Sequence, residues 1–314
     1  MRSKLIICAA LLCALACLVP GAALAKHVSK TLAKHAPKTT TSYYLSLGDS
    51  LSVGAQPDAQ GTTLATNQGY ANFLYAIERR RIKGLKLEQL GCPGESTGSM
   101  INGGLCTYPQ GSQLQAALAF IATHKIAFIT LDIGANDIDT CGSVTTTVIN
   151  TACVNDGISS INSDVPTIAS DLRDAAGPKV RIAAMTYYDV YMADYLQGTL
   201  GQREASLSVP LTQSVNDALT ADFAAQGFIM ADVGSAFDVY KPFSTTVVTA
   251  MGTLPVAVAE TCQLTWMCSA PPIGANIHAT VAGYQEIAEV FAASMDGIPS
   301  SPILAGGESP LQQQ

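Results

Sequence analysis

Charged residues are scarce in this chain of 314 residues, at 13% of the total, whereas apolar residues make up 48%. Such a composition can bury a sizeable core, which excludes a disordered protein. Acidic residues outnumber basic ones, and the formal net charge is −7. Because phosphate binding requires a basic surface, this charge argues against a nucleic-acid partner.

Long apolar runs are also missing, with one exception at the N-terminus. Two basic residues precede an apolar run over residues 5–19, and a small-residue cleavage site ends at Ala25. This order predicts a secretory signal peptide of residues 1–25 and therefore a secreted, extracellular protein. The alternative is a lipoprotein signal, in which Cys17 would carry a lipid anchor. Elsewhere no apolar run reaches the roughly 20 residues that cross a bilayer, so we expect no transmembrane span in the mature chain.

Motifs that bind metals or nucleotides are absent as well. The sequence has no Cys-x-x-Cys pair, and the turn after the first predicted strand has neither G-x-G-x-x-G nor a P-loop lysine. We therefore expect no metal and no cofactor. Of nine cysteines, three lie in the predicted signal peptide. In an exported chain the other six predict three disulfides, and pairing in sequence order is the simplest choice. These six are Cys92, Cys106, Cys141, Cys153, Cys262 and Cys268.

Strands and helices alternate along residues 43–296, which predicts one α/β domain. A basic, flexible linker of residues 26–42 precedes it, and a disordered tail of residues 297–314 follows it. Strands are expected at 43–47, 85–90, 126–133, 179–187 and 228–233. Helices are expected at 70–81, 112–124, 156–176 with an interruption around Pro166, 209–226 and 280–295.

A Gly-Asp-Ser turn follows the first predicted strand and presents Ser50 at the strand's carboxyl end, where an α/β sheet carries its chemistry. Ser50 is the candidate nucleophile; the alternative is a turn with a simple polar cap. A serine hydroxyl needs a neighbouring base, and histidine has a suitable pKa. His27 and His35 lie in the linker, and His124 ends a predicted helix. His278 remains as the candidate base.

Acyl transfer also needs hydrogen-bond donors for the oxyanion of the tetrahedral intermediate. The backbone N–H groups of Ser50 and Gly94 and the side-chain amide of Asn136 all follow predicted strands, and so meet at one edge of the sheet. The alternatives are a turn glycine at Gly94 and a capping residue at Asn136.

Four segments, in this order, resemble the motifs of the SGNH (GDSL-like) hydrolase family. They are Leu47-Gly48-Asp49-Ser50-Leu51-Ser52, Gly94 in its glycine-containing loop, Ile133-Gly134-Ala135-Asn136-Asp137, and Asn276-Ile277-His278-Ala279. The sequences of the last two segments are similar to those of the secreted bacterial branch of the family, which carries three disulfides.

The resemblance covers residues 43–296 and implies a flavodoxin-like, three-layer α/β/α sandwich. Its central, mostly parallel sheet would have about five strands. It also implies metal-independent ester hydrolysis, with Ser50 as nucleophile and His278 as base. Gly94 and Asn136 would complete the oxyanion hole.

The last motif departs from the family pattern. The family usually has Asp-x-x-His, which would place an aspartate where this chain has Ala275. We therefore expect His278 to be oriented by the main-chain carbonyl of Ala275 or by the side-chain oxygen of Asn276. Because a neutral group stabilises the imidazolium less than a carboxylate does, activity at neutral to alkaline pH is expected.

The sequence thus predicts a secreted serine esterase or lipase. Two alternatives stay open: a carbohydrate acetyl esterase acting on polysaccharide, and a non-catalytic surface-binding protein that retains the hydrolase fold. The partner expected is a small-molecule, lipid or glycan ester, and the chain is expected to be a monomer. Residues 241–275 are expected to form a long, partly ordered excursion near the site, in which the apolar residues 245–259 form either an acyl pocket or ordinary packing.

Overall fold

The structure is a computed structural model that describes residues 41–143 and 148–297. The predicted signal peptide, with Cys17, lies outside these residues, as do nearly all of the predicted linker and tail. All described residues belong to one unit of the chain, residues 39–314.

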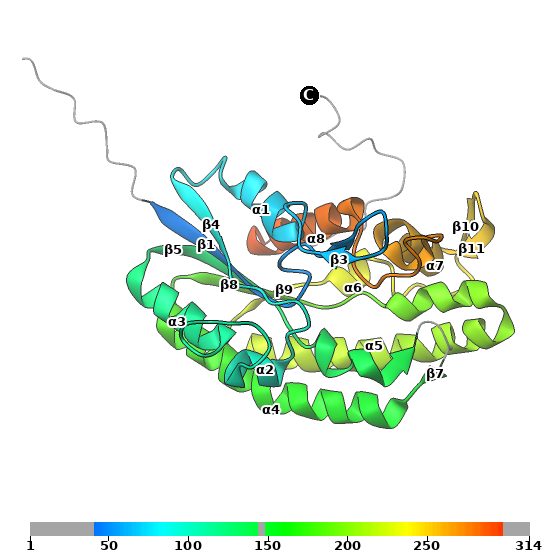
Figure 1. Ribbon diagram of the computed structural model, residues 1–314, viewed down its shortest axis with the longest axis horizontal. Coiled ribbons are helices and arrows are strands. Elements are labelled where there is room, and N and C mark those ends of the chain that lie inside the picture. Colours follow the sequence, from blue (N-terminus) through cyan, green and yellow to red (C-terminus); the bar gives the residue numbers. More distant parts are fainter. Residues whose placement is uncertain (1–40, 144–147, 298–314) are drawn as a thin grey trace, which may run out of the picture. The chain divides into compact units, whose positions relative to one another are not determined.

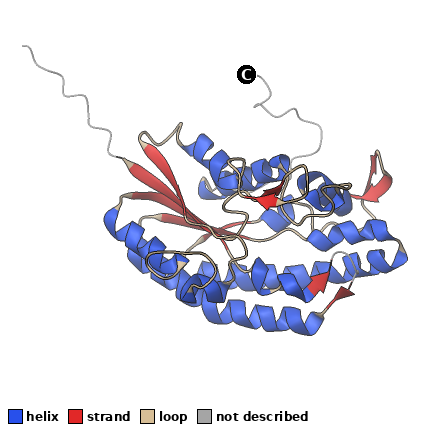
Figure 2. Cartoon of the chain, viewed as in Figure 1, coloured by secondary structure: helices blue, strands red, loops and turns tan. Residues whose placement is uncertain are grey.

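A central sheet of five parallel strands organises this unit, and Figure 2 shows these strands in red. Their order across the sheet is β4-β1-β5-β8-β9. In sequence order the strands are β1 (Ser42–Gly48), β4 (Leu85–Gln89), β5 (Ile126–Asp132), β8 (Arg181–Met185) and β9 (Ile229–Ala231). This is the strand order of a flavodoxin-like sheet, as predicted. The chain adds β4 on one side of β1 and then β5, β8 and β9 on the other side, so the order of addition reverses between β1 and β5.

Helices cover both faces of the sheet (Figure 1). One layer consists of α1 (Tyr70–Glu78), α6 (Val233–Ala236), α7 (Val256–Leu264) and α8 (Val281–Met295). The other consists of α2 (Thr97–Asn102), α3 (Gln113–Thr123), α4 (Thr151–Ala176) and α5 (Thr199–Ala225). The chain is therefore the three-layer α/β/α sandwich that the sequence predicts.

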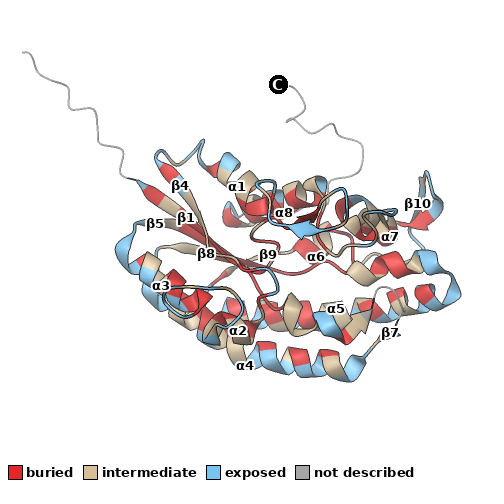
Figure 3. Cartoon of the chain, in the orientation of Figure 1, coloured by how far each residue is buried: buried red, intermediate tan, exposed pale blue. Residues whose placement is uncertain are grey.

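Burial of the strands on both faces explains their almost unbroken apolar sequences. In Figure 3 the core strands are largely buried, whereas the helices alternate buried and exposed residues. Phe128, Ile129 and Leu131 of β5 are each fully or almost fully buried. Polar caps fix the helix starts: the Ser112 hydroxyl accepts from the Gln115 N–H at the start of α3.

Short elements fill the connections. The two-stranded pairs are β2 (Gln56–Pro57) with β3 (Thr63–Leu64), β6 (Gly142–Ser143) with β7 (Val148–Ile149), and β10 (Thr246–Thr249) with β11 (Gly252–Pro255). The 3-10 helices are η1 (Ala135–Asp137), η2 (Asp139–Cys141), η3 (Val190–Gln197) and η4 (Trp266–Cys268). The region 241–275 is thus better ordered than predicted, since it holds a hairpin and α7.

Two long helices differ from the predictions. α4 starts at Thr151 and continues through Pro166, where an interruption was expected, and α5 starts ten residues before the predicted Val209 and contains Pro210. Proline removes one backbone donor. In α4 the flanking residues Val165 and Ile168 are fully buried against the core, and this packing holds the helix together around the missing bond.

The three disulfides join the six cysteines in sequence order, as predicted: Cys92–Cys106, Cys141–Cys153 and Cys262–Cys268. Among the described helices, none is both long and apolar enough to cross a membrane.

Candidate active site

The turn that carries Ser50 depends on close contact between β1 and β5. Gly48 ends β1 with a φ of 130°, and a Cβ there would lie 2.1 Å from the Asp132 carbonyl oxygen of β5. Only glycine fits this position. The Asp49 N–H donates to the same carbonyl at 3.0 Å. Ser50 follows, half-buried, at the carboxyl edge where the strand order reverses.

Two carboxyl groups, those of Asp49 and Asp132, lie buried next to this turn. The Asp49 N–H is 3.2 Å from Asp132 Oδ2, Tyr70 donates to Asp132 Oδ1, and Tyr187 donates to Asp49 Oδ2 at 2.8 Å. Burial raises the pKa of both carboxyls, and the charge of Asp49 raises the pKa of Asp132 further. Because the two carboxyls are buried close together, a negative charge on one opposes ionisation of the other.

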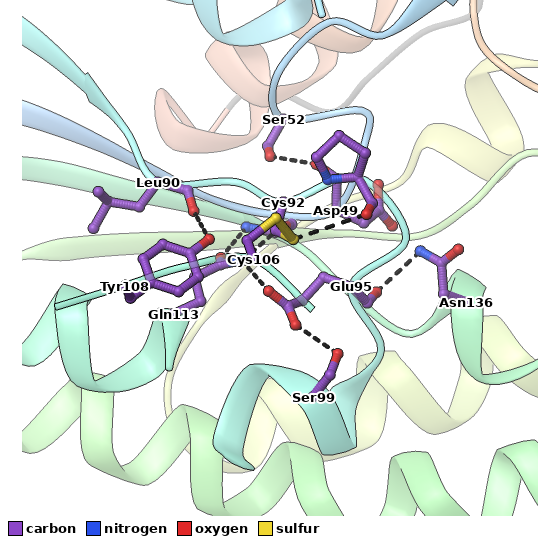
Figure 4. The surroundings of a disulfide bond; sticks show 12 residues. Asp49, Ser52, Leu90, Cys92, Glu95, Ser99, Cys106, Tyr108, Gln113 and Asn136 are labelled. Atoms are coloured by element: carbon purple, nitrogen blue, oxygen red, sulfur yellow. Dashed lines mark hydrogen bonds between the residues drawn. A yellow bond between two sulfur atoms is a disulfide. The ribbon is translucent and has the colours of Figure 1, made fainter. Parts of the chain in front are cut away.

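The loop that contains Gly94 is tied to the end of β1 by Gln113 of α3 (Figure 4). The Gln113 side chain accepts from the Gly48 N–H at 2.6 Å and donates to the Gly48 carbonyl at 2.9 Å and to the Glu95 carboxylate at 2.9 Å. The disulfide between Cys92 and Cys106 anchors the same loop, and the Cys92 N–H donates to the Gly48 carbonyl. Gly94 has a φ of 84°, which favours glycine.

Asn136 lies in η1, directly after β5. Its Nδ2 donates to the Glu95 carbonyl at 3.0 Å, and Figure 4 shows the amide directed at that carbonyl. An amide NH₂ group has two hydrogens. One hydrogen is therefore fixed by the loop next to Gly94, and the second can serve a ligand in the adjacent cavity.

His278 lies just before α8 and is 9% exposed. Its Nδ1 is 2.7 Å from Asn276 Oδ1, and its backbone N–H donates to the same oxygen at 3.1 Å. A backbone N–H can only donate, so the Asn276 atom must be the oxygen; its Nδ2 then donates to Thr63 Oγ1 at 2.8 Å. His278 therefore carries its proton on Nδ1 and leaves Nε2 as an acceptor. Ala275, the other expected orienter, is exposed.

Burial lowers the pKa of His278 to about 4. The imidazole is therefore neutral, and able to accept a proton, down to about pH 5. This direction bears on the expected pH dependence, because weaker stabilisation of the imidazolium lets the ring lose its proton at lower pH. The neutral form of the ring therefore persists into the acid region.

Ser50, Asn136 and His278 line one cavity of about 110 Å³. Its walls are mostly apolar, and three aspartates, Asp49, Asp139 and Asp189, are also among the lining residues. Burial raises the pKa of Asp189 to about 6. The apolar and aromatic wall residues are Leu51, Ala135, Ile138, Tyr187, Tyr188, Val190, Tyr191, Val215 and Ile277.

The structure thus brings Ser50, Asn136 and His278 together, although they are far apart in sequence. Gly94 is outside the cavity wall, but its neighbour Glu95 bonds to Asn136. His124 stacks on Phe120 at the end of α3, outside the cavity, in agreement with a structural role. The apolar residues 245–259 do not line the cavity; the β8–α5 connection does.

Sequence reasoning missed the tyrosines and Asp189 of this wall. One signal could have identified them, since Tyr187-Tyr188-Asp189 lies at the end of the strand predicted at 179–187, at the same edge of the sheet as Ser50 and Asn136. Within the described residues, no group of three His, Cys, Asp or Glu side chains is arranged to hold a metal ion.

No protein-family model matches the sequence, and no curated protein matches it either. Several solved structures share its fold. An extracellular lipase from Streptomyces rimosus is 18% identical over 81% of this chain and 100% of the lipase, with a TM-score of 0.53. A phospholipase A1 from Streptomyces albidoflavus is 18% identical over 81% of this chain and 100% of its own, with a TM-score of 0.52.

A third structure is described as a putative GDSL-like lipase from Parabacteroides merdae. It is 14% identical over 82% of this chain and 97% of its own, with a TM-score of 0.50. The resemblance noted from the sequence motifs is thereby supported by the whole architecture. The fold of this chain is that of the SGNH (GDSL-like) hydrolases.

Proposed function

We propose that the protein is a serine hydrolase of carboxylic esters that works through an acyl-enzyme on Ser50. The observation that carries the proposal is the convergence of Ser50, Asn136 and His278 on one cavity, with the Nδ1 of His278 already bonded. An unprotonated Nε2 on a histidine that lines the same cavity as Ser50 supports general-base activation.

In the proposed mechanism, Nε2 of His278 removes the Ser50 hydroxyl proton while Oγ attacks the ester carbonyl carbon. The carbonyl oxygen becomes an oxyanion, which accepts hydrogen bonds from the Ser50 and Gly94 N–H groups and from Asn136 Nδ2. When the intermediate collapses, the C–O bond to the alcohol breaks and His278 donates its proton to the departing oxygen. Water, deprotonated by His278, then releases the acid from Ser50 by the same steps.

The size of the cavity supports short acyl groups. A protein cavity of about 150 Å³ accommodates a benzene molecule. The volume here is about 110 Å³, so by the same comparison it takes an acyl chain of roughly two to four carbons. An acetyl group also fits, which keeps an acetylated polysaccharide as the second candidate substrate.

The charge of the cavity supports neutral esters. Three aspartates, Asp49, Asp139 and Asp189, line it, and the described residues that line it include no lysine or arginine. An anionic phosphate group placed there would meet carboxyl groups and no cationic partner. We therefore propose that phospholipids are poor substrates, although one protein of similar fold is a phospholipase A1.

We also propose that the protein is secreted. Three disulfides in the described domain favour an oxidising compartment. The predicted signal peptide would direct the chain there. Detection of a mature chain that begins at Lys26 in the culture medium would test the cleavage site.

A panel of p-nitrophenyl esters of increasing acyl length, with an acetylated glycan and a phosphatidylglycerol alongside, tests the activity. We expect rates to be highest for acetate and butyrate. Ser50→Ala should abolish turnover and labelling by a fluorophosphonate, whereas Ser159→Ala, a matched change on the exposed surface of α4, should preserve both. Folded parent protein that neither labels nor hydrolyses any ester would support the non-catalytic alternative instead.

A further inference from the structure

Two adjacent tyrosines that follow β8, Tyr187 and Tyr188, bond to the residues that immediately precede Ser50 and His278. Both are largely buried and both line the cavity. The Tyr187 hydroxyl donates to Asp49 Oδ2 at 2.8 Å, and the Tyr188 hydroxyl donates to the Ile277 carbonyl at 2.8 Å. Each tyrosine therefore holds the residue that immediately precedes a proposed catalytic one.

The bond to Asp49 bears directly on the backbone around Ser50. Asp49 Oδ1 accepts from the Leu51 N–H at 2.9 Å, while Oδ2 accepts from Tyr187. The carboxylate thus spans the serine, with one oxygen bonded to the N–H of Leu51, the residue after it, and the other to Tyr187. Loss of the Tyr187 hydroxyl would leave a buried carboxylate oxygen without this donor and would free the turn to rotate.

The bond to Ile277 acts on the loop before α8. Asn276 orients the imidazole from one side, through the bond to Nδ1. Tyr188 bonds to the carbonyl of the Ile277–His278 peptide. The position of the ring relative to the sheet therefore depends on a hydroxyl from the segment after β8 as well as on Asn276.

The two tyrosines are themselves held rigidly. Asn216 of α5 accepts from the Tyr187 N–H and donates to the Tyr187 carbonyl, both at 2.8 Å. The Tyr188 ring stacks on Phe237, with centroids 4.7 Å apart and planes within 11°. Side chains whose rotamers are locked in this way can hold the residues that they bond to in a fixed place.

We propose that Tyr187 and Tyr188 are positioning residues that set the distance and angle between Ser50 and His278. The proposal rests on the proposed function, and it explains how two loops separated by more than 200 residues keep one geometry. A displacement of the order of 1 Å between reacting groups can cost about a hundredfold in rate. The hydroxyls act through Asp49 and Ile277, so substrate binding is expected to change little.

The test measures kcat and KM for p-nitrophenyl acetate, and the rate of fluorophosphonate labelling, in Tyr187→Phe and Tyr188→Phe. We expect kcat and the labelling rate to fall together by roughly ten- to a hundredfold in each variant, with KM changed by less than about threefold. The double variant should lose little more than the worse single one, because either loss already separates the pair. Tyr75→Phe, which removes a tyrosine hydroxyl bonded to the Leu85 carbonyl outside the cavity, should keep the parent values.

A raised KM with unchanged kcat would overturn the proposal, because it would make the tyrosines part of the substrate wall. Parent-like kinetics in both variants would overturn it too, while an inactive Ser50→Ala would leave the proposed function standing. An active Ser50→Ala would instead refute the proposed function. If the phenylalanine variants fail to fold, Phe237→Leu is the substitute, because it loosens the Tyr188 ring without removing either hydroxyl. This variant should lower kcat without raising KM. An unchanged kcat would count against the proposal.

Discussion

The neutral orienter of His278 makes a strong prediction about pH. The change Asn276→Asp keeps the size and shape of the side chain but places a carboxylate oxygen where Oδ1 now lies, 2.7 Å from Nδ1. Thr63, which now accepts from Asn276, has a hydroxyl that can donate to the carboxylate instead. The geometry is therefore preserved while the charge next to the ring changes from zero to −1.

The size of the effect follows from the charge and the distance. Two unit charges about 4 Å apart interact by about 4 kcal/mol at an effective dielectric constant of about 20, which corresponds to about three pKa units. Part of this gain is lost in burying the carboxylate, so a rise of about one to three units is expected. The pKa of His278, about 4 in the parent, should therefore rise to roughly 5 to 7 in the variant.

The assay is the pH dependence of kcat/KM, followed with a short-chain ester by pH-stat titration. The acid limb of this profile reports the pKa of the free enzyme's base. We expect the limb near pH 4 in the parent and one to three units higher in Asn276→Asp, with a plateau at least as high, because the carboxylate stabilises the imidazolium that forms in the transition state. Asn150→Asp, which adds the same charge at the exposed N-cap of α4, should leave the limb in place.

Two results would refute this reasoning. An acid limb that stays where it is in Asn276→Asp would mean that Asn276 is not the group bonded to Nδ1 in the working enzyme. A parent limb between pH 6 and 7 would mean that burial does not lower the pKa of His278 as described.

Two further predictions concern the oxyanion hole and acid stability. Asn136→Ala removes one proposed oxyanion donor and should lower kcat by about 10² to 10³ with little change in KM, as measured by steady-state kinetics on a short-chain ester; a change confined to KM would place Asn136 in ground-state binding. Because the pKa of His278 is lower in the folded than in the unfolded chain, its contribution to stability is lost as the pH falls from about 6.5 to about 4. This loss amounts to about 3 kcal/mol. The free energy of unfolding of the parent and of His278→Gln, measured by urea unfolding across this pH range, checks the loss. The parent should lose about 3 kcal/mol more than the variant as the pH falls, and an equal pH dependence of the two would contradict the assigned pKa.

The sequence alone predicted the parts of this protein that depend on local pattern. The apolar run at 126–133 indicated a strand buried on both faces, and β5 occupies the middle of the sheet. The short spacing between successive cysteines indicated the disulfide pairs that the structure contains. Ser50 and Asn136 could be assigned to one edge because the carboxyl ends of parallel strands meet there. Each of these inferences needs only a neighbouring stretch of chain or a general rule of topology.

Tertiary packing decided the rest. The continuation of α4 through Pro166 depends on burial of its flanking residues, which local propensity does not include. The place of the Asn276 side chain depends in part on Thr63, 213 residues away, whose hydroxyl accepts from Asn276 Nδ2.

The direction of the His278 pKa shift was likewise decided by burial of the ring, which lowers the pKa whatever the neighbouring sequence. The bonds of Tyr187 and Tyr188 to the loops that carry Ser50 and His278 join three segments that have no proximity in the sequence. Sequence pattern therefore determined which groups carry the proposed chemistry, because strand ends and residue types are local properties. Their charge state and relative placement arise only when distant segments exclude water from one another and exchange hydrogen bonds.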